Sequence, residues 1–174
     1  MGKKENSERA RTDGGQEVGE ASRLEVERED GALGYTVCAA VYTTNDCEDP
    51  MAAALEAVAA APAYEELKAA HEAVWDTLWR RAQVIIEGDA EAEQALNYSL
   101  YHLMSIAPRH ANSLSVAARG LSGQTYKGAV FWDTEMFMLD FYLAVMPEVA
   151  KTTLQYRIDT LPCALEKAAE YGYR

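Results

Sequence analysis

The sequence has 174 residues, which suits one domain of ordinary size, and its 49% of hydrophobic and 25% of charged residues exclude a wholly disordered chain. Acidic residues outnumber basic ones 28 to 16, and the net charge of -12 argues against a binder of nucleic acid or of an anionic membrane. No apolar run approaches the roughly 18 residues of a membrane span, and no signal peptide is recognisable. We therefore expect a globular, cytoplasmic protein.

Three cysteines are scattered along the chain: Cys38, Cys47 and Cys163. Their odd number and their spacing fit neither a disulfide framework nor a zinc site. We expect buried free thiols, as in a cytoplasmic protein.

Residues 1–21 have the composition of a disordered tail. Glycines lie among charged residues, and Val18 is the only sizeable apolar side chain after Met1. Such a segment cannot bury enough apolar surface to offset the entropy of ordering.

Residues 22–47 predict a β-hairpin. Apolar and charged residues alternate from Arg23 to Arg28, Asp30-Gly31 is a turn signal, and an uncharged run rich in β-branched and aromatic residues follows from Gly34 to Thr43. Because an isolated hairpin is only marginally stable in water, these strands must join other strands or pack on helices.

Residues 48–82 predict a helical linker. An Ala-rich run is followed by Pro62, which ends a first helix, and the spacing over 63–81 predicts a second, amphipathic helix. Trp75 and Trp79 lie one turn apart on it, and we expect both to be core residues.

Residues 83–107 predict a short strand followed by a helix. Gln83–Glu87 is a short β-like run, and Gly88 breaks it. Asp89 is a good N-cap for a helix that continues to Ala107.

The region from Arg109 to Phe131 shows no persistent period and carries three glycines. A connection of this length inside a compact domain is usually functional or disordered, and its apolar flanks favour an ordered binding loop. It lacks the ending of a phosphate-binding P-loop.

Three helices are predicted beyond this loop. The first, 134–146, is apolar nearly all round and should be buried. The second spans 148–159, and Pro162 opens the third, which Gly172 should terminate as its C-cap.

The densest group of chemically capable residues lies at Phe131–Glu135. An indole face can pack on the C–H face of a pyranose, and a carboxylate beside it can accept hydrogen bonds from adjacent hydroxyls. Trp132 and Asp133 fit this role. They equally fit a core tryptophan and a capping aspartate, and the residues alone do not choose between the two interpretations.

A metal site is not expected here. Asp133, Glu135 and Asp140 match no calcium-loop spacing, and no histidine stands beside them. The three histidines of the chain are isolated, which favours packing or surface roles.

Four blocks occur in order along the chain: Asn97–Leu103 (NYSLYHL), Ala118–Gly123 (ARGLSG), Tyr126–Gly128 (YKG) and Phe131–Glu135 (FWDTE). Together they resemble glycoside hydrolase family 65, the family of maltose, trehalose and kojibiose phosphorylases. Two further stretches, Trp75–Asp89 and Tyr156–Leu161, look like that family's linker helix with its entry to the barrel and like the helix after its first substrate loop.

The resemblance implies a mainly α fold that is a piece of a larger architecture. Residues 22–47 would be the last strands of a β-sandwich, 48–82 the linker, and 83–174 the first helices of an (α/α)6 barrel.

The resemblance also implies an activity. It predicts inverting phosphorolysis of an α-glucosidic disaccharide, with inorganic phosphate as co-substrate and no other cofactor, to β-glucose 1-phosphate and glucose. Substrate-binding residues would be Trp132, Asp133, Phe131, Tyr126 and Glu135.

The chain departs from the family's pattern in two respects. Family members commonly have His where Ala129 stands, and none of the chain's own glutamates matches the general-acid motif. We therefore expect no catalytic residue in this chain and no turnover by it alone. Hydrolysis on the same barrel and a non-catalytic helical interaction module remain the alternatives, and a homo-oligomer stays open.

Overall fold

A computed structural model describes residues 2–111, 114–120, 123 and 125–173. The chain forms two compact units, Met1–Ala73 and Val74–Arg174, and half of it is helical. No helix in the described part of the chain is both long and apolar enough to cross a bilayer.

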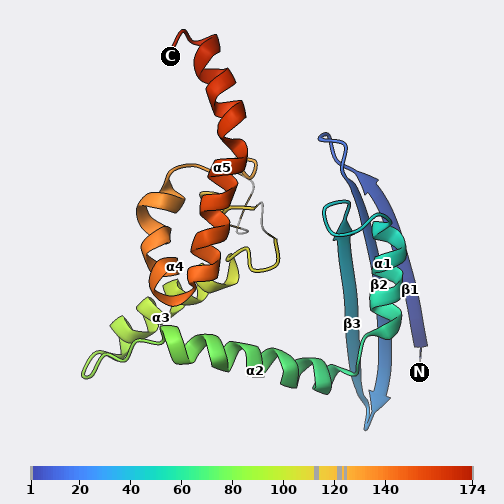
Figure 1. The fold of residues 1–174 in the computed structure, drawn as a ribbon. Coiled ribbons are helices and arrows are strands. Elements are labelled where there is room, and N and C mark those ends of the chain that lie inside the picture. The colour runs from blue at the N-terminus through green and yellow to red at the C-terminus, as the bar shows by residue number, and fades with distance from the viewer. Residues whose placement is uncertain (1, 112–113, 121–122, 124, 174) are drawn as a thin grey trace. The chain divides into compact units, whose positions relative to one another are not determined.

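The first unit is built on a three-stranded antiparallel sheet in the order β1-β2-β3 (Figure 1). Its strands are β1 (Gly2–Arg11), β2 (Glu17–Glu29) and β3 (Ala32–Thr43). The prediction of a disordered tail over 1–21 is therefore wrong.

Strand β1 forms because its backbone finds a partner that its composition does not reveal. It pairs with β2 along its whole length, from Gly2 opposite Val26 to Arg11 opposite Glu17. Charged side chains are common on edge strands, where they discourage pairing with other chains. The low apolar content of this segment is thus a property of an edge strand.

The predicted hairpin is confirmed. Glu29 pairs with Ala32, and the two residues between them, Asp30 and Gly31, have positive φ angles of 47° and 81°. Two left-handed residues make the tight turn whose twist matches that of the strands.

Helix α1 (Pro50–Ala60) covers one face of this sheet (Figure 1). Asp49 caps it by accepting a hydrogen bond from the N–H of Ala52. Ala54 and Val58 are buried against Ala21 of β2. At the other end of the helix, the guanidinium of Arg23 donates to the carbonyl of Val58 at 2.8 Å.

The contact between α1 and the sheet requires a glycine at position 19. A Cβ there would lie 2.4 Å from backbone atoms of Pro50 and Met51. We expect Gly19→Ala to lower the free energy of unfolding by about 1–3 kcal/mol, because the helix would have to move away. Gly34→Ala is the matched control, since that Cβ would meet no atom within 4 Å. Urea unfolding followed by circular dichroism measures both, and equal stabilities would contradict the prediction.

The second unit contains the C-terminal part of α2 (Tyr64–Ala82), then α3 (Ala90–Ser105), the π-helical turn η1 (Thr134–Met138), α4 (Leu139–Val145) and α5 (Pro147–Glu170). Its core brings together side chains of the four α-helices, of the residues that follow α3 and α4, and of the loop before η1: Leu78, Ala82, Met104, Ala107, Val116, Tyr142, Met146, Val149 and Ala150. Trp75 and Trp79 pack against this core, as predicted, and Trp75 stacks on Tyr101 with ring centroids 5.0 Å apart.

The strand predicted over 83–87 is wrong. The segment is irregular, and its backbone is held by side chains of α3. The amide of Asn97 accepts from the N–H of Val84 at 3.1 Å and donates to its carbonyl at 2.8 Å, and Glu93 accepts from the N–H of Ile86. Side chains thus supply the partners that a neighbouring strand would otherwise provide.

The predicted helix break at Pro162 is also wrong, because α5 continues through this residue to Glu170. A proline inside a helix removes one backbone hydrogen bond, which a helix of this length accommodates here.

The C-cap prediction is confirmed. Gly172 has a φ of 79°, and the N–H groups of Gly172 and Tyr173 donate to carbonyls of the last turn.

Two burial predictions need correction. The helix over 134–146 buries Tyr142 and Met146, but its opposite side is open, and Phe137 is 74% exposed. An all-round apolar helix is buried only where neighbours cover it, and α5 and the core cover one side. The cysteines are free, as predicted, but Cys163 is exposed and the other two are half-buried.

Candidate functional site

The segment 131–138 enters the helical part of the second unit through an irregular turn. The N–H of Leu139 donates to the carbonyl of Thr134, five residues back, which makes η1 a single π-helical turn. Such turns leave the regular helical register and are frequent at functional sites. The turn directly follows the loop predicted to bind a ligand, and that loop is irregular throughout its described residues.

Two aromatic rings stand exposed at the start of this segment. Trp132 is 62% exposed, and its ring centroid lies 4.9 Å from that of Phe131, itself largely exposed. Tyr126, in the preceding loop, is also exposed. The alternative interpretation of Trp132 as a core residue is therefore wrong.

Asp133 occupies the N-cap position of η1 but does not act as a cap. Its backbone is helical, and its side chain makes no capping hydrogen bond. Asp133 is half-buried and directly follows Trp132, whose indole is exposed. The pair therefore offers an apolar ring face and a carboxylate acceptor side by side along the chain.

Glu135 faces the protein. Its two carboxylate oxygens accept hydrogen bonds from Nε and Nη2 of Arg157, on α5, both at 2.8 Å. These bonds hold the pKa of Glu135 below its ordinary value, and the same pairing raises the pKa of Arg157. Glu135, predicted to bind substrate, is thus engaged with α5. No local pattern predicts this partner, because 22 residues separate Glu135 from Arg157.

Two further hydrogen bonds hold this region. The hydroxyl of Thr134, fully buried, donates to the carbonyl of Val116 at 2.8 Å and joins η1 to the preceding loop. The hydroxyl of Tyr142 donates to the carbonyl of Leu103 at 3.0 Å and joins α4 to α3. Burial raises the pKa of Tyr142 to about 12.

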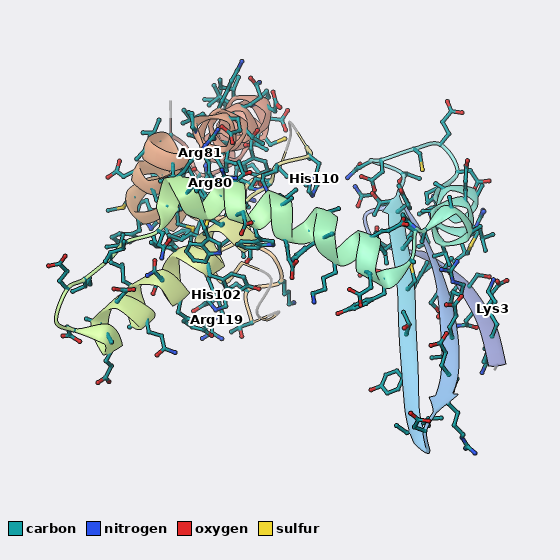
Figure 2. The ribbon with its side chains drawn as sticks, turned by 90° about the horizontal axis from the view of Figure 1, so that it is seen from below. Lys3, Arg80, Arg81, His102, His110 and Arg119 are labelled. Carbon is teal, nitrogen blue, oxygen red and sulfur yellow. The ribbon has the colours of Figure 1, made fainter. Side chains whose placement is uncertain are left out.

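An open hollow of about 750 Å³ lies beside this segment, between α3, the loop and η1. Aromatic and polar side chains line it, among them Tyr98, Tyr101, His102, Arg119 and Phe137. Figure 2 shows His102 and Arg119 close together. The side chains that line this hollow do not include Trp132 or Asp133.

A metal site finds no support in the described residues, because none of them form a group of three or more His, Cys, Asp or Glu side chains suited to an ion. The candidate site therefore consists of exposed aromatic rings, the carboxylate of Asp133, which makes no capping hydrogen bond, and the scaffold that holds them.

The ion pair of Glu135 predicts a dependence of stability on pH. Because the folded state lowers the pKa of Glu135 below 4.5, the pair stabilises the fold fully above about pH 4.5, and the contribution is lost as the pH falls through the folded-state pKa. Near pH 7 we expect Glu135→Gln to cost about 1 kcal/mol, since the pair is partly exposed. Thermal unfolding across pH 3–7 measures the difference between wild type and variant. A difference that does not shrink at low pH would contradict the prediction.

Comparison with known proteins identifies relatives that match most of the chain. Residues 97–174 match the model of the glycosyl hydrolase family 65 central catalytic domain. A nigerose phosphorylase of Lachnoclostridium phytofermentans is 59% identical over 143 residues, which are 81% of this chain and 19% of the relative. A kojibiose hydrolase of Flavobacterium johnsoniae is 45% identical over 103 residues, 59% of this chain and 15% of the relative.

The fold has a counterpart among solved structures. A protein described as a kojibiose phosphorylase from human microbiome superposes with a TM-score of 0.74 at 19% identity, over 92% of this chain and 24% of that one. At this identity the likeness concerns the fold alone. The chain spans about a fifth of the length of the first curated relative.

Proposed function

The chain belongs to glycoside hydrolase family 65, and from this membership we propose that it is part of an inverting phosphorylase of α-glucosidic disaccharides. The products would be β-glucose 1-phosphate and glucose. The similarity to a nigerose phosphorylase supports phosphorolysis, with inorganic phosphate as the co-substrate.

In this reaction a phosphate oxygen attacks the anomeric carbon while a carboxylic acid protonates the departing glycosidic oxygen. We assign to this chain the binding of the glucosyl unit and neither of those two steps. The indole of Trp132 would pack on the C–H face of the sugar, and Asp133 would accept hydrogen bonds from adjacent hydroxyls. The exposure of Trp132 together with the absence of a capping bond to Asp133 carries this assignment.

Phe131 and Tyr126 would extend the aromatic surface around this contact, since both are exposed. Glu135 is the weaker candidate of the two carboxylates, because Arg157 already donates a hydrogen bond to each of its oxygens.

The proposed place of the chain in the larger enzyme follows its two units. The sheet would belong to the end of a β-sandwich, 48–82 would form the linker, and 83–174 would supply the first helices of an (α/α)6 barrel. The exposed apolar face of η1 and α4 supports this proposal, because further barrel helices would cover such a face. The general acid would lie outside residues 1–174, so this chain alone would not turn over.

The sugar contact is tested in the full-length protein that contains this chain. We expect Asp133→Ala to lower kcat/KM for the disaccharide by about 10²-fold or more, because the hydroxyls lose their acceptor in both ground and transition states. Asp140→Ala, which removes an exposed carboxylate on α4, is the matched control and should leave the rate unchanged. An Asp133→Ala variant as active as the control would remove Asp133 from the site.

Hydrolysis on the same scaffold is the second candidate function, and the similarity to a kojibiose hydrolase supports it. The two activities differ in their dependence on phosphate. For a phosphorylase, we expect release of glucose from the disaccharide to require phosphate and to match the release of β-glucose 1-phosphate mole for mole. Two monosaccharides formed at the same rate without phosphate would establish the hydrolase.

A further inference from the structure

We propose that Arg157 is a positioning residue that fixes the direction in which Trp132 and Asp133 meet the sugar. This inference rests on the proposed function. It concerns a residue on α5 that does not itself touch the substrate.

The hydrogen bonds of Arg157 enclose the two proposed sugar ligands along the chain. Nη2 donates to the carbonyl of Phe131 at 2.8 Å, directly before Trp132. Nε and Nη2 donate to the carboxylate of Glu135, two residues after Asp133. The guanidinium of Arg157 therefore binds the chain both before Trp132 and after Asp133.

The bond to the Phe131 carbonyl has a direct geometric consequence. That carbonyl belongs to the planar peptide that joins Phe131 to Trp132. Holding its oxygen restrains rotation of this peptide plane, and the plane together with the φ angle of Trp132 sets the direction in which the Cα–Cβ bond of Trp132 leaves the backbone. The indole is mostly exposed, so other side chains hold it only weakly.

The planar geometry of the guanidinium makes these hydrogen bonds directional. A guanidinium is planar and matches a carboxylate with two parallel bonds, so it fixes orientation as well as distance. A lysine ammonium at position 157 could reach one acceptor at a time. The pair is only partly exposed, at 37% for Arg157 and 26% for Glu135, so water screens it incompletely.

A second restraint acts on the same segment. The buried hydroxyl of Thr134 is bonded to the carbonyl of Val116 in the preceding loop. Positions 131, 134 and 135 are thus fixed by α5 and the loop. Within the described part of the chain, the carboxylate of Asp133, which lies between them, makes no recorded hydrogen bond and stays available for a ligand.

The decisive experiment compares Michaelis constants in the full-length protein. We expect Arg157→Met to lower kcat/KM for the disaccharide by about 10²-fold, as misplacement of a binding group by about 1 Å can do, and to raise KM for the disaccharide. KM for phosphate should be unchanged. Arg157→Lys should lose about tenfold, because it keeps the charge without the fork. Arg81→Met removes an exposed arginine of α2 and is the matched control.

A second measurement follows the indole directly and does not require turnover. With Trp75 and Trp79 replaced by Phe in the 174-residue chain, Trp132 is its one remaining tryptophan, and the fluorescence of Trp132 reports its mobility. We expect Arg157→Met to lower its anisotropy and to increase its quenching by acrylamide, while the circular dichroism spectrum is retained. Arg157→Lys serves the same measurement if Arg157→Met does not fold.

The outcomes separate the two hypotheses. If Asp133→Ala abolishes activity but Arg157→Met matches Arg81→Met in both measurements, the positioning role is overturned. A loss of kcat in proportion to the folded fraction, with unchanged KM and unchanged anisotropy of Trp132, also overturns it. If Asp133→Ala retains full activity, the proposed sugar site fails, and the anisotropy still decides whether Arg157 holds the indole.

Discussion

The placement of the candidate site depends on one guanidinium. Arg157 lies on the long helix α5, whereas its acceptors, the carboxylate of Glu135 and the carbonyl of Phe131, lie in a turn that has no regular helical register of its own. A π-helical turn after a long loop would be poorly determined by backbone hydrogen bonds alone. The ion pair transfers the rigidity of a packed helix to that turn, and it does so at the residues that flank the exposed indole of Trp132.

The same turn separates two faces of the second unit. On the inner face, Thr134, Tyr142 and Met146 are buried, and the hydroxyl groups of Thr134 and Tyr142 donate to carbonyls in other segments. On the outer face, large apolar side chains such as Phe137 remain exposed. The segment from η1 to α4 is apolar on both sides, but α5 and the core cover only one of these sides. The other side is suited to contact further helices of the same barrel in the proposed larger enzyme.

Local signals in the sequence predicted the elements whose stability is local. The turn at Asp30-Gly31 and the end of α5 at Gly172 were predicted correctly, because the residue type and the backbone conformation determine each other there. Two of the errors arose where a distant partner decides. Strand β1 forms on β2 despite a composition typical of disorder, and the segment 83–87 is satisfied by the side chain of Asn97 instead of a strand. Periodicity and propensity contain no information about such partners.

The candidate site also depends on distant partners that the sequence does not reveal. The pattern FWDTE identified a segment with the right chemistry, but it gave Asp133 and Glu135 the same prospects as ligands, since both are carboxylates at the start of a helix. The structure distinguishes them, because both oxygens of Glu135 are engaged by Arg157 while the carboxylate of Asp133 caps nothing. A carboxylate that already accepts two hydrogen bonds from an arginine has less acceptor capacity left for sugar hydroxyls than a carboxylate that makes no capping bond. Sequence can therefore locate a site of this kind, but dividing it into ligands and scaffold requires the contacts made across the fold.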